Sequence, residues 1–413
     1  MNDTITFFQQ PGVYIVEGFY PRTYASICIK AGCEVESAGF NGMAHLVEHV
    51  SLSYRLHQPT LAARNDEFIK AGFQFSGYTN YGQSVLHISF PTSSVNFMKK
   101  FSEILKGIYS RSVLQEDVFE IARSEILDEC HNMKSHWDWQ SKVIRFITDN
   151  QINVLPVGNI KDIEGFEIAD AFSFMHTFYT KGNCALIIQS GLGIEEIRRL
   201  LFPFIEGCSY IDHFLPIKSV PGVINNETVR TLVLKNSSDF TLVEFFIQRK
   251  YETLDLPKKI TRMLFEIISK IKIEGYMIDS VYHQKFIENL VSDKHITESF
   301  YYTVFTFKFS SVVVDASEFA EDIMNFLQKC EFSETEFRQA KQIVEGFSSE
   351  PDVPDYDDIF ENLSANFFYN EPIHITRQHY RQIIAALSRI ELDDVRAYRR
   401  WAFTGKCKIV ISS

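Results

Sequence analysis

His45, Glu48 and His49 form the pattern H-x-x-E-H, which constrains this chain more than any other feature of its sequence. On a helix that turns about 100° per residue, the two histidines lie one turn apart on one face, with Glu48 at the edge of that face. Two neutral imidazoles placed in this way can bind one metal ion, and the carboxylate then lies beside the remaining coordination position. The pattern inverts the H-E-x-x-H zinc motif and indicates metal-assisted hydrolysis.

The simpler interpretation is an amphipathic helix whose histidines share a face by chance, because short motifs give false positives. Two observations argue against it. A β-type run over residues 24–30 and a glycine-bearing loop precede the motif, so the motif falls at a helix start. A third ligand is also available on the helix predicted over 116–133, where Glu125 and Glu129 are four residues apart and share one face.

The composition fits a soluble globular protein and excludes some functions. The 413 residues are too many for one ordinary core and fit two domains of about 200 residues each. Hydrophobic residues make up 45% and charged residues 23%. The net charge of −12 argues against a nucleic-acid surface, which needs clustered Lys and Arg to neutralise phosphates. No nucleic-acid partner is therefore expected.

A weak internal repeat predicts that the two domains are related. Residues 178–188 resemble residues 402–411, because in each case a helix ending in aromatic residues leads through a glycine turn into a β-branched strand. Residues 215–224 are rich in breakers and form the predicted linker between domains 1–214 and 225–413. Periodicity in the first domain predicts strands at 24–30, 83–90 and 184–189 and helices at 95–110, 116–133 and 168–179.

The N-terminus and the cysteines predict a compartment. The first residues have no basic segment followed by a long apolar run, so we expect no secretory signal and no membrane span. The seven cysteines are scattered, odd in number and without a C-x-x-C pair. They indicate reduced thiols in a cytoplasmic protein and argue against a cysteine-based zinc site.

Several segments of the first domain together resemble the pitrilysin-type, insulinase-like zinc metallopeptidases. The run 31–49 is similar to that family's zinc-helix region, a strand ending "aGs..E" followed by "nGlAH..EH". Gly72 and residues 77–79 resemble the family's edge-strand motif, "GG..NAyT". Residues 156–163 and 179–183 resemble the family's "PilGt.e.I" and "YtpdN" segments. The resemblance covers nearly all of the first domain and is faint in the second.

The resemblance implies a role for each residue that matches the motif. His45 and His49 would be zinc ligands, and Glu48 would be the general base that takes a proton from the attacking water. Glu129 would be the third ligand, because the run 122–129 matches the family's "ER..vi.E" with Glu129 in the ligand place. The separation from His49 slightly favours Glu125, which stays the alternative. Ser76, Gly77, Tyr78 and Thr79 would bind the substrate backbone.

The sequence departs from the family pattern at three places. A second glutamate usually lies seven residues before the third ligand and supports the site, and that position is Ala122 here. The edge-strand asparagine is replaced by Ser76. The family's second domain carries an Arg and Tyr pair that grips the substrate, and residues 281–307 show no convincing counterpart. This last absence is typical of the zinc subunit in a heterodimer, as in the branch similar to the mitochondrial processing peptidases.

The resemblance implies an α+β fold, with two related domains of mixed sheet plus helices that form one half-shell of a clam-like peptidase chamber. It implies a zinc metalloendopeptidase that cleaves peptides or unfolded segments, such as a small peptide precursor. A homologous partner subunit would supply the Arg and Tyr pair, and a homodimer is the alternative. A non-catalytic member that binds peptide or scaffolds a complex is the other interpretation. A purely structural zinc site is disfavoured, because such sites use four closed ligands.

One acidic, proline-punctuated stretch, residues 350–358, stands outside these motifs. We interpret it as a solvated surface turn. A peptide-binding role for its carboxylates is the alternative.

Overall fold

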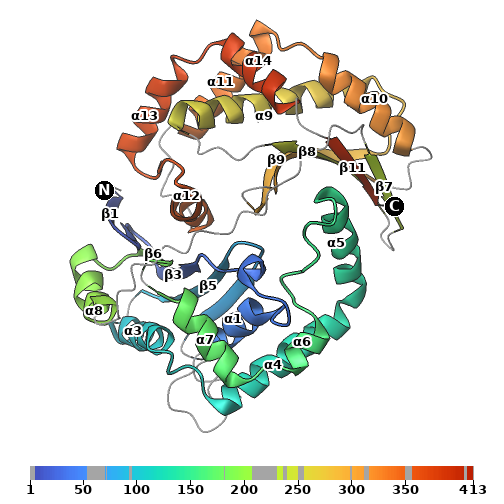
Figure 1. Cartoon of the computed structure of the whole chain (residues 1–413). Coiled ribbons are helices and arrows are strands. Elements are labelled where there is room, and N and C mark those ends of the chain that lie inside the picture. The colour runs from blue at the N-terminus through green and yellow to red at the C-terminus, as the bar shows by residue number, and fades with distance from the viewer. Residues whose placement is uncertain are drawn as a thin grey trace. The chain divides into compact units, whose positions relative to one another are not determined.

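The computed structural model of the chain divides into two compact units (Figure 1). The N-terminal unit comprises residues 1–140, 154–218 and 352–376, and the C-terminal unit comprises residues 141–153, 219–351 and 377–413. The structure describes residues 5–53, 70, 72–92, 95–180, 182–206, 230–235, 240–249, 255–297, 300–310, 316–348, 356–403 and 407–412. The predicted linker at 215–224 lies outside these residues.

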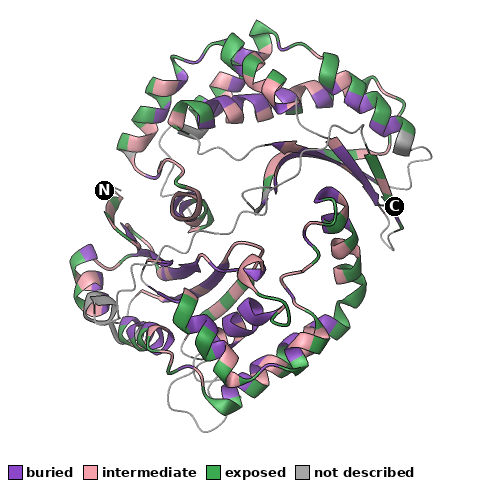
Figure 2. Cartoon of the chain, in the orientation of Figure 1, coloured by how far each residue is buried: buried purple, intermediate pink, exposed green. Residues whose placement is uncertain are grey.

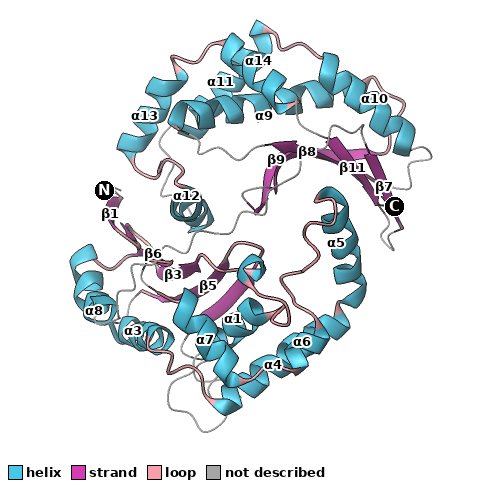
Figure 3. Ribbon diagram, viewed as in Figure 1, coloured by secondary structure: helices cyan, strands magenta, loops and turns pink. Residues whose placement is uncertain are grey.

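A six-stranded mixed sheet forms the centre of the N-terminal unit, in the order β1-β2-β6-β3-β5-β4 (Figure 3). The central strand β6 is buried along its whole length, as expected for a strand covered on both faces. Strand β4 forms one edge of this sheet, and among the described residues it pairs with β5 alone. The strands are β1 (Thr6–Gln10), β2 (Val13–Glu17), β3 (Arg22–Ile29), β4 (Gln74–Thr79), β5 (Ser84–Pro91) and β6 (Cys184–Ser190).

Helices cover both faces of this sheet. Because alternate residues of a strand point to opposite sides, each strand contributes side chains to the packing on both faces. Leu86 packs in the larger core with α1, whereas Val85 packs with Ile359 and Leu363 of α12 on the other face. Figure 2 shows the buried residues along the strands and over most of α1. The short η1 (Cys33–Val35) precedes helices α1 (Met43–Ser53), α3 (Val95–Tyr109), α4 (Glu116–Asn132), α5 (Lys134–Ile147), α6 (Ile160–Glu164), α7 (Ile168–Phe178), α8 (Ile194–Glu206) and α12 (Tyr356–Tyr369).

The C-terminal unit has a five-stranded sheet in the order β7-β11-β8-β10-β9. Its core is rich in aromatic residues, with Phe245 and Phe307 of the sheet in edge-to-face contact at a centroid distance of 5.6 Å. The strands are β7 (Arg230–Leu234), β8 (Thr241–Arg249), β9 (Phe286–Thr297), β10 (Phe300–Phe309) and β11 (Cys407–Ser412). The helices are α9 (Leu256–Ile278), α10 (Ala316–Lys329), α11 (Glu334–Ser348), α13 (Arg377–Leu387) and α14 (Leu392–Ala402).

The two units repeat one topology, which confirms the predicted relation between them and the predicted α+β class. The order β2-β6-β3-β5-β4 matches β7-β11-β8-β10-β9, and in each sheet the first two of these strands are parallel and the rest antiparallel. The two segments that resemble each other in sequence lead into β6 and β11, which hold equivalent places.

The units are not contiguous in sequence, which the division into 1–214 and 225–413 did not anticipate. Residues 141–153, which include the end of α5, belong to the C-terminal unit, and residues 352–376, which contain α12, belong to the N-terminal unit. The two segments hold equivalent places in the repeat, so the exchange is reciprocal. Local periodicity cannot reveal it, because an amphipathic helix does not specify which sheet it covers.

The predicted elements of the first domain are confirmed with ends shifted by at most about two residues. The interpretation of 350–358 as a turn was wrong at its end, where Tyr356, Asp357 and Asp358 form the first turn of α12. Carboxylates in a first turn stabilise a helix through its dipole. Within the described part of the chain, no helix combines the length and the apolar character that crossing a membrane requires.

Candidate metal centre

Helix α1 begins two residues before His45, as predicted, and its first turn is held by a carboxylate from the preceding loop. The Glu36 side chain accepts hydrogen bonds from the backbone N–H of Gly42 at 2.9 Å and of Ala44 at 2.8 Å. These donors lack partners within the helix, and an acceptor at this end also interacts favourably with the helix dipole. Gly42 has a φ of 104°, which favours glycine. The loop therefore fixes the axial position of the two histidines.

The structure brings the side chains of His45, His49 and Glu129 together. The Nε2 atom of His45 lies 3.6 Å and that of His49 4.0 Å from Oε2 of Glu129. Potential ligand atoms of the three residues all lie within 4.8 Å of one another, so the group could hold a metal ion. Two imidazoles and one carboxylate are the ligand types of catalytic zinc sites, which keep a further position open.

The carboxylate of Glu125 contacts His49 on the other side of its ring. Its Oε2 atom lies 3.0 Å from Nδ1 of His49, whereas Nε2 of His49 faces Glu129. This is the arrangement in which an outer carboxylate orients a ligating histidine. Glu125 thus occupies a supporting position and Glu129 a ligand position. The assignment of Glu129 as the third ligand stays a prediction, and the geometry favours it over Glu125.

The two histidines have opposite pKa shifts. Burial, together with the neighbouring His49, lowers the pKa of His45 to about 4, which keeps its imidazole neutral as a metal ligand must be. Burial also lowers the pKa of His49, but the hydrogen bond with Glu125 and the charges of Glu48, Glu125 and Glu129 outweigh it and raise the pKa overall.

Glu48 is buried against the edge strand β4. Its Oε2 atom accepts a hydrogen bond from the Thr79 hydroxyl at 2.9 Å. A Cβ atom on Gly77 would lie 2.7 Å from Oε1 of Glu48, so only glycine leaves room for this carboxylate. Burial raises the Glu48 pKa to about 7, although His49 and Thr79 oppose the shift. A carboxyl with a pKa near neutrality can both accept and donate a proton at physiological pH.

The four residues predicted to bind substrate alternate along β4. Gly77 and Thr79 face α1 and Glu48, whereas Ser76 and Tyr78 line a cavity on the opposite face of the sheet. The sequence did not reveal the contacts of Gly77 and Thr79 with Glu48. The signal that could have found them is a glycine inside a strand, which marks a close approach. Their role in binding substrate stays a prediction.

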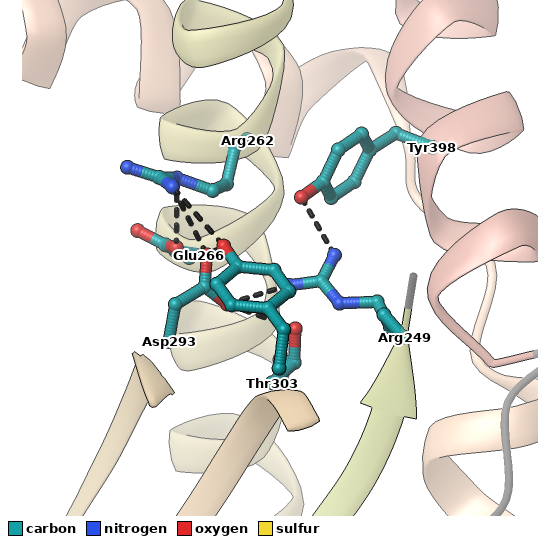
Figure 4. A network of polar contacts seen from close by, with 7 residues as sticks. Arg249, Arg262, Glu266, Asp293, Thr303 and Tyr398 are labelled. Atoms are coloured by element: carbon teal, nitrogen blue, oxygen red, sulfur yellow. Dashed lines mark hydrogen bonds and ion pairs between the residues drawn. The ribbon is translucent and has the colours of Figure 1, made fainter. Parts of the chain in front are cut away.

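The C-terminal unit contains a cluster of arginine and tyrosine side chains (Figure 4). This cluster lies partly outside residues 281–307, the region in which the sequence shows no counterpart of the family's Arg and Tyr pair. Arg249 and Arg262 each form an ion pair with Asp293, the second at 3.0 Å, and Asp293 also accepts hydrogen bonds from Tyr301 and Thr303. The Arg249 side chain is only 2% exposed. Because both guanidinium groups are engaged by Asp293, this cluster is not a pair that reaches outward to grip a substrate.

A repeated mixed-sheet unit with H-x-x-E-H on the helix beside an edge strand defines a peptidase-like fold. The sequence profile of the family Insulinase (Peptidase family M16) matches residues 17–160. No curated protein gives a significant sequence match. Over residues 17–160, which include H-x-x-E-H, the chain is therefore similar to the insulinase family.

Solved structures resemble the chain over its whole length. The periplasmic protease PqqL from Escherichia coli matches with a TM-score of 0.81 and 14% identity, over 100% of this chain and 48% of that one. Pitrilysin matches with a TM-score of 0.77 and 12% identity, over 100% of this chain and 45% of that one. The peptidase M16 inactive domain from Pseudomonas fluorescens matches with a TM-score of 0.74 and 13% identity, over 99% and 97%. The chain spans about half the length of PqqL and of pitrilysin.

We expect Glu129→Gln to lower the affinity for zinc by more than about a hundredfold and Glu125→Gln by about tenfold, because the first residue would be a ligand and the second its support. Competition with a chromophoric chelator measures both affinities. Asp128→Asn is the matched control, since Asp128 is an exposed carboxylate on the same helix. A larger loss in Glu125→Gln than in Glu129→Gln would reverse the two roles.

Because the pKa of Glu48 is raised in the folded protein, the unfolding free energy of the metal-free protein should depend on pH. A carboxyl whose pKa rises on folding contributes stability that is present below its unfolded pKa and lost as the pH rises through its folded pKa. The pH window therefore runs from about 4.5 to about 7. Relative to wild type, Glu48→Gln should gain roughly 3 kcal/mol of unfolding free energy between pH 4 and pH 8. Urea denaturation across this range measures it, and a constant difference would contradict the shift.

Proposed function

We propose that the chain is the metal-bearing half of a zinc metalloendopeptidase that cleaves peptides or unfolded segments. The main support for this proposal is the group of His45, His49 and Glu129, whose potential ligand atoms lie within 4.8 Å of one another. This group lies beside the buried carboxylate of Glu48. The match of residues 17–160 to the family Insulinase (Peptidase family M16) supports the same reaction class.

Each residue of the candidate metal centre would have its own role. His45, His49 and Glu129 would hold the zinc ion, which would supply Lewis-acid activation of a peptide carbonyl and of water. Glu48 would take a proton from water as the water attacks and would pass it to the leaving amine. The Thr79 hydroxyl holds the Glu48 carboxylate in one orientation while it does so.

The edge strand β4 supports a peptide as the substrate. Among the described residues no strand pairs with the side of β4 that faces away from β5, so an extended peptide could add there through main-chain hydrogen bonds. Because Gly77 and Thr79 of this strand contact Glu48, a peptide in that place would run past the catalytic carboxylate. This mode selects extended segments rather than folded proteins.

We also propose that the chain acts together with a partner subunit. The chain spans 48% of PqqL and 45% of pitrilysin, so in those proteins a second half of similar size is part of the same chain. In the C-terminal unit, Arg249 and Arg262 are tied to Asp293. We therefore propose that a homologous partner subunit supplies the substrate-gripping Arg and Tyr.

A cytoplasmic location stays part of the proposal. It is supported by the free cysteines among the described residues, which are Cys28, Cys33, Cys130, Cys184, Cys330 and Cys407.

Glu48→Gln should lower kcat/KM for peptide cleavage by about a thousandfold, because the general base is lost, while zinc binding stays within a few-fold of wild type. Cleavage of an internally quenched peptide and the zinc content of the same sample measure the two effects. Asp128→Asn is the matched control. Undiminished cleavage by folded Glu48→Gln would contradict this mechanism, and absence of cleavage by zinc-loaded wild type with its partner would favour a non-catalytic peptide-binding protein.

Cleavage should depend on a second subunit. We expect the purified chain to bind zinc alone but to cleave peptides at least about tenfold faster when it is mixed with its co-purifying homologous subunit, because substrate positioning strongly affects the rate. Sedimentation and cleavage assays across mixing ratios, with a maximum at one to one, test this. Full activity in the isolated chain would contradict the heterodimer and indicate a self-sufficient enzyme or a homodimer.

A further inference from the structure

The N-terminal unit contains a cavity of about 680 Å³ on the face of its sheet opposite α1. Strands β4 and β5 line one side through residues that include Tyr78 and His87, and α12 lines the other side. The metal group and Glu48 play no part in this cavity, so the catalytic proposal leaves it unexplained.

Aromatic rings form a fixed floor in the cavity. Tyr356 of α12 stacks on Tyr24 of β3 at a centroid distance of 4.5 Å, and Phe360 contacts the His87 ring edge-to-face at 4.7 Å. The Tyr356 hydroxyl lies 2.8 Å from Nδ1 of His87. These contacts hold the rings in place, and ring faces of this kind attract cations.

Two carboxylates add negative charge to this floor. Asp357 and Glu361 lie one turn apart on α12, line the cavity and are exposed. Neither side chain forms an ion pair or a hydrogen bond with the described residues. Burial lowers the pKa of His87, so that its ring is neutral at pH 7. Arg22 lies at the border of the cavity, where its guanidinium donates hydrogen bonds to Ser89 at 3.0 Å and to Gln74 at 3.4 Å, and the lining itself includes no Lys or Arg among the described residues. The part of the cavity beside Asp357 and Glu361 is therefore complementary to a positive charge carried on an apolar stem.

The position of the cavity relative to β4 connects it to the substrate. Side chains alternate between the two faces of a strand, and a peptide that adds to the edge of β4 shares this alternation. Gly77 faces α1 and the carboxylate of Glu48, whereas Ser76 and Tyr78, its neighbours on either side, line the cavity. A peptide on this edge would place alternate side chains toward the catalytic carboxylate and toward the cavity.

We propose that this cavity is a specificity pocket for a lysine or arginine side chain of the substrate, at a position next to the residue that faces Glu48. The alkyl stem of the basic side chain lies across the ring of Phe360, and the charged end reaches Asp357 and Glu361. This inference rests on the proposed peptidase function, but binding alone can test it.

The first experiment is a cleavage profile of the zinc-loaded chain with its partner subunit. The substrates are internally quenched peptides in which one residue at a time is arginine, norleucine or glutamate. We expect kcat/KM to be about tenfold higher for arginine than for norleucine at one position. The double variant Asp357→Asn/Glu361→Gln should lose this preference and keep its rate on the norleucine peptide. Asp358→Asn, a change on the same helix outside the cavity lining, is the control and should keep the preference.

The second experiment measures binding, so that failure of the pocket can be told from failure of the peptidase. Fluorescence anisotropy with the Glu48→Gln chain should show about tenfold tighter binding of the arginine peptide than of the norleucine peptide. This difference should disappear in Glu48→Gln combined with Asp357→Asn and Glu361→Gln. Equal affinities, or a difference that survives removal of both carboxylates, would overturn the pocket. Selective binding without any cleavage would retain the pocket and overturn the peptidase.

Discussion

The close approach of α1 to β4 at Gly77 is the constraint on which the candidate site depends. Any side chain at position 77 would meet the Glu48 carboxylate, so the strand can lie this near the helix only where it has no Cβ. The approach buries Glu48 and raises its pKa, and it also places the Thr79 hydroxyl within hydrogen-bond distance. One glycine therefore connects the helix of the candidate metal centre to the edge on which we propose that a peptide binds.

The C-terminal unit has the same strand order but no glycine at the place equivalent to Gly77. Leu86, the partner of Gly77, opposes β3 two residues before that strand ends, and Thr303, the partner of Asp293, opposes β8 two residues before its end. Asp293 therefore holds the place equivalent to Gly77.

At that place, the first helix of each unit contributes a charged side chain of opposite sign. Glu48 of α1 lies against Gly77, whereas Arg262 of α9 forms an ion pair with Asp293. Where the N-terminal unit buries Glu48 against a glycine, the C-terminal unit thus has a network of charged side chains. Breaking such a buried pair costs several kcal/mol, so this network stabilises one conformation.

Sequence reasoning predicted the local features of this protein and missed those that depend on distant contacts. The start of α1 and the extent of α4 follow from residue types within a few positions, so both were predicted closely. The exchange of α12 depends on contacts such as that of His87 with Tyr356, which are far apart in the chain. No local pattern encodes such a pairing, so the sequence predicts a turn over the acidic stretch at 350–358 and does not reveal the cavity.

The role of Glu125 shows how the structure changes the meaning of a departure from the family pattern. From the sequence, Ala122 indicated that outer support for the site was missing. In the structure Ala122 is fully buried in the core, where a carboxylate would be costly to desolvate. Glu125, one turn further along α4, contacts Nδ1 of His49 and directs Nε2 toward Glu129. The support that is absent at position 122 is therefore available from position 125, so the substitution at 122 is no argument against metal binding.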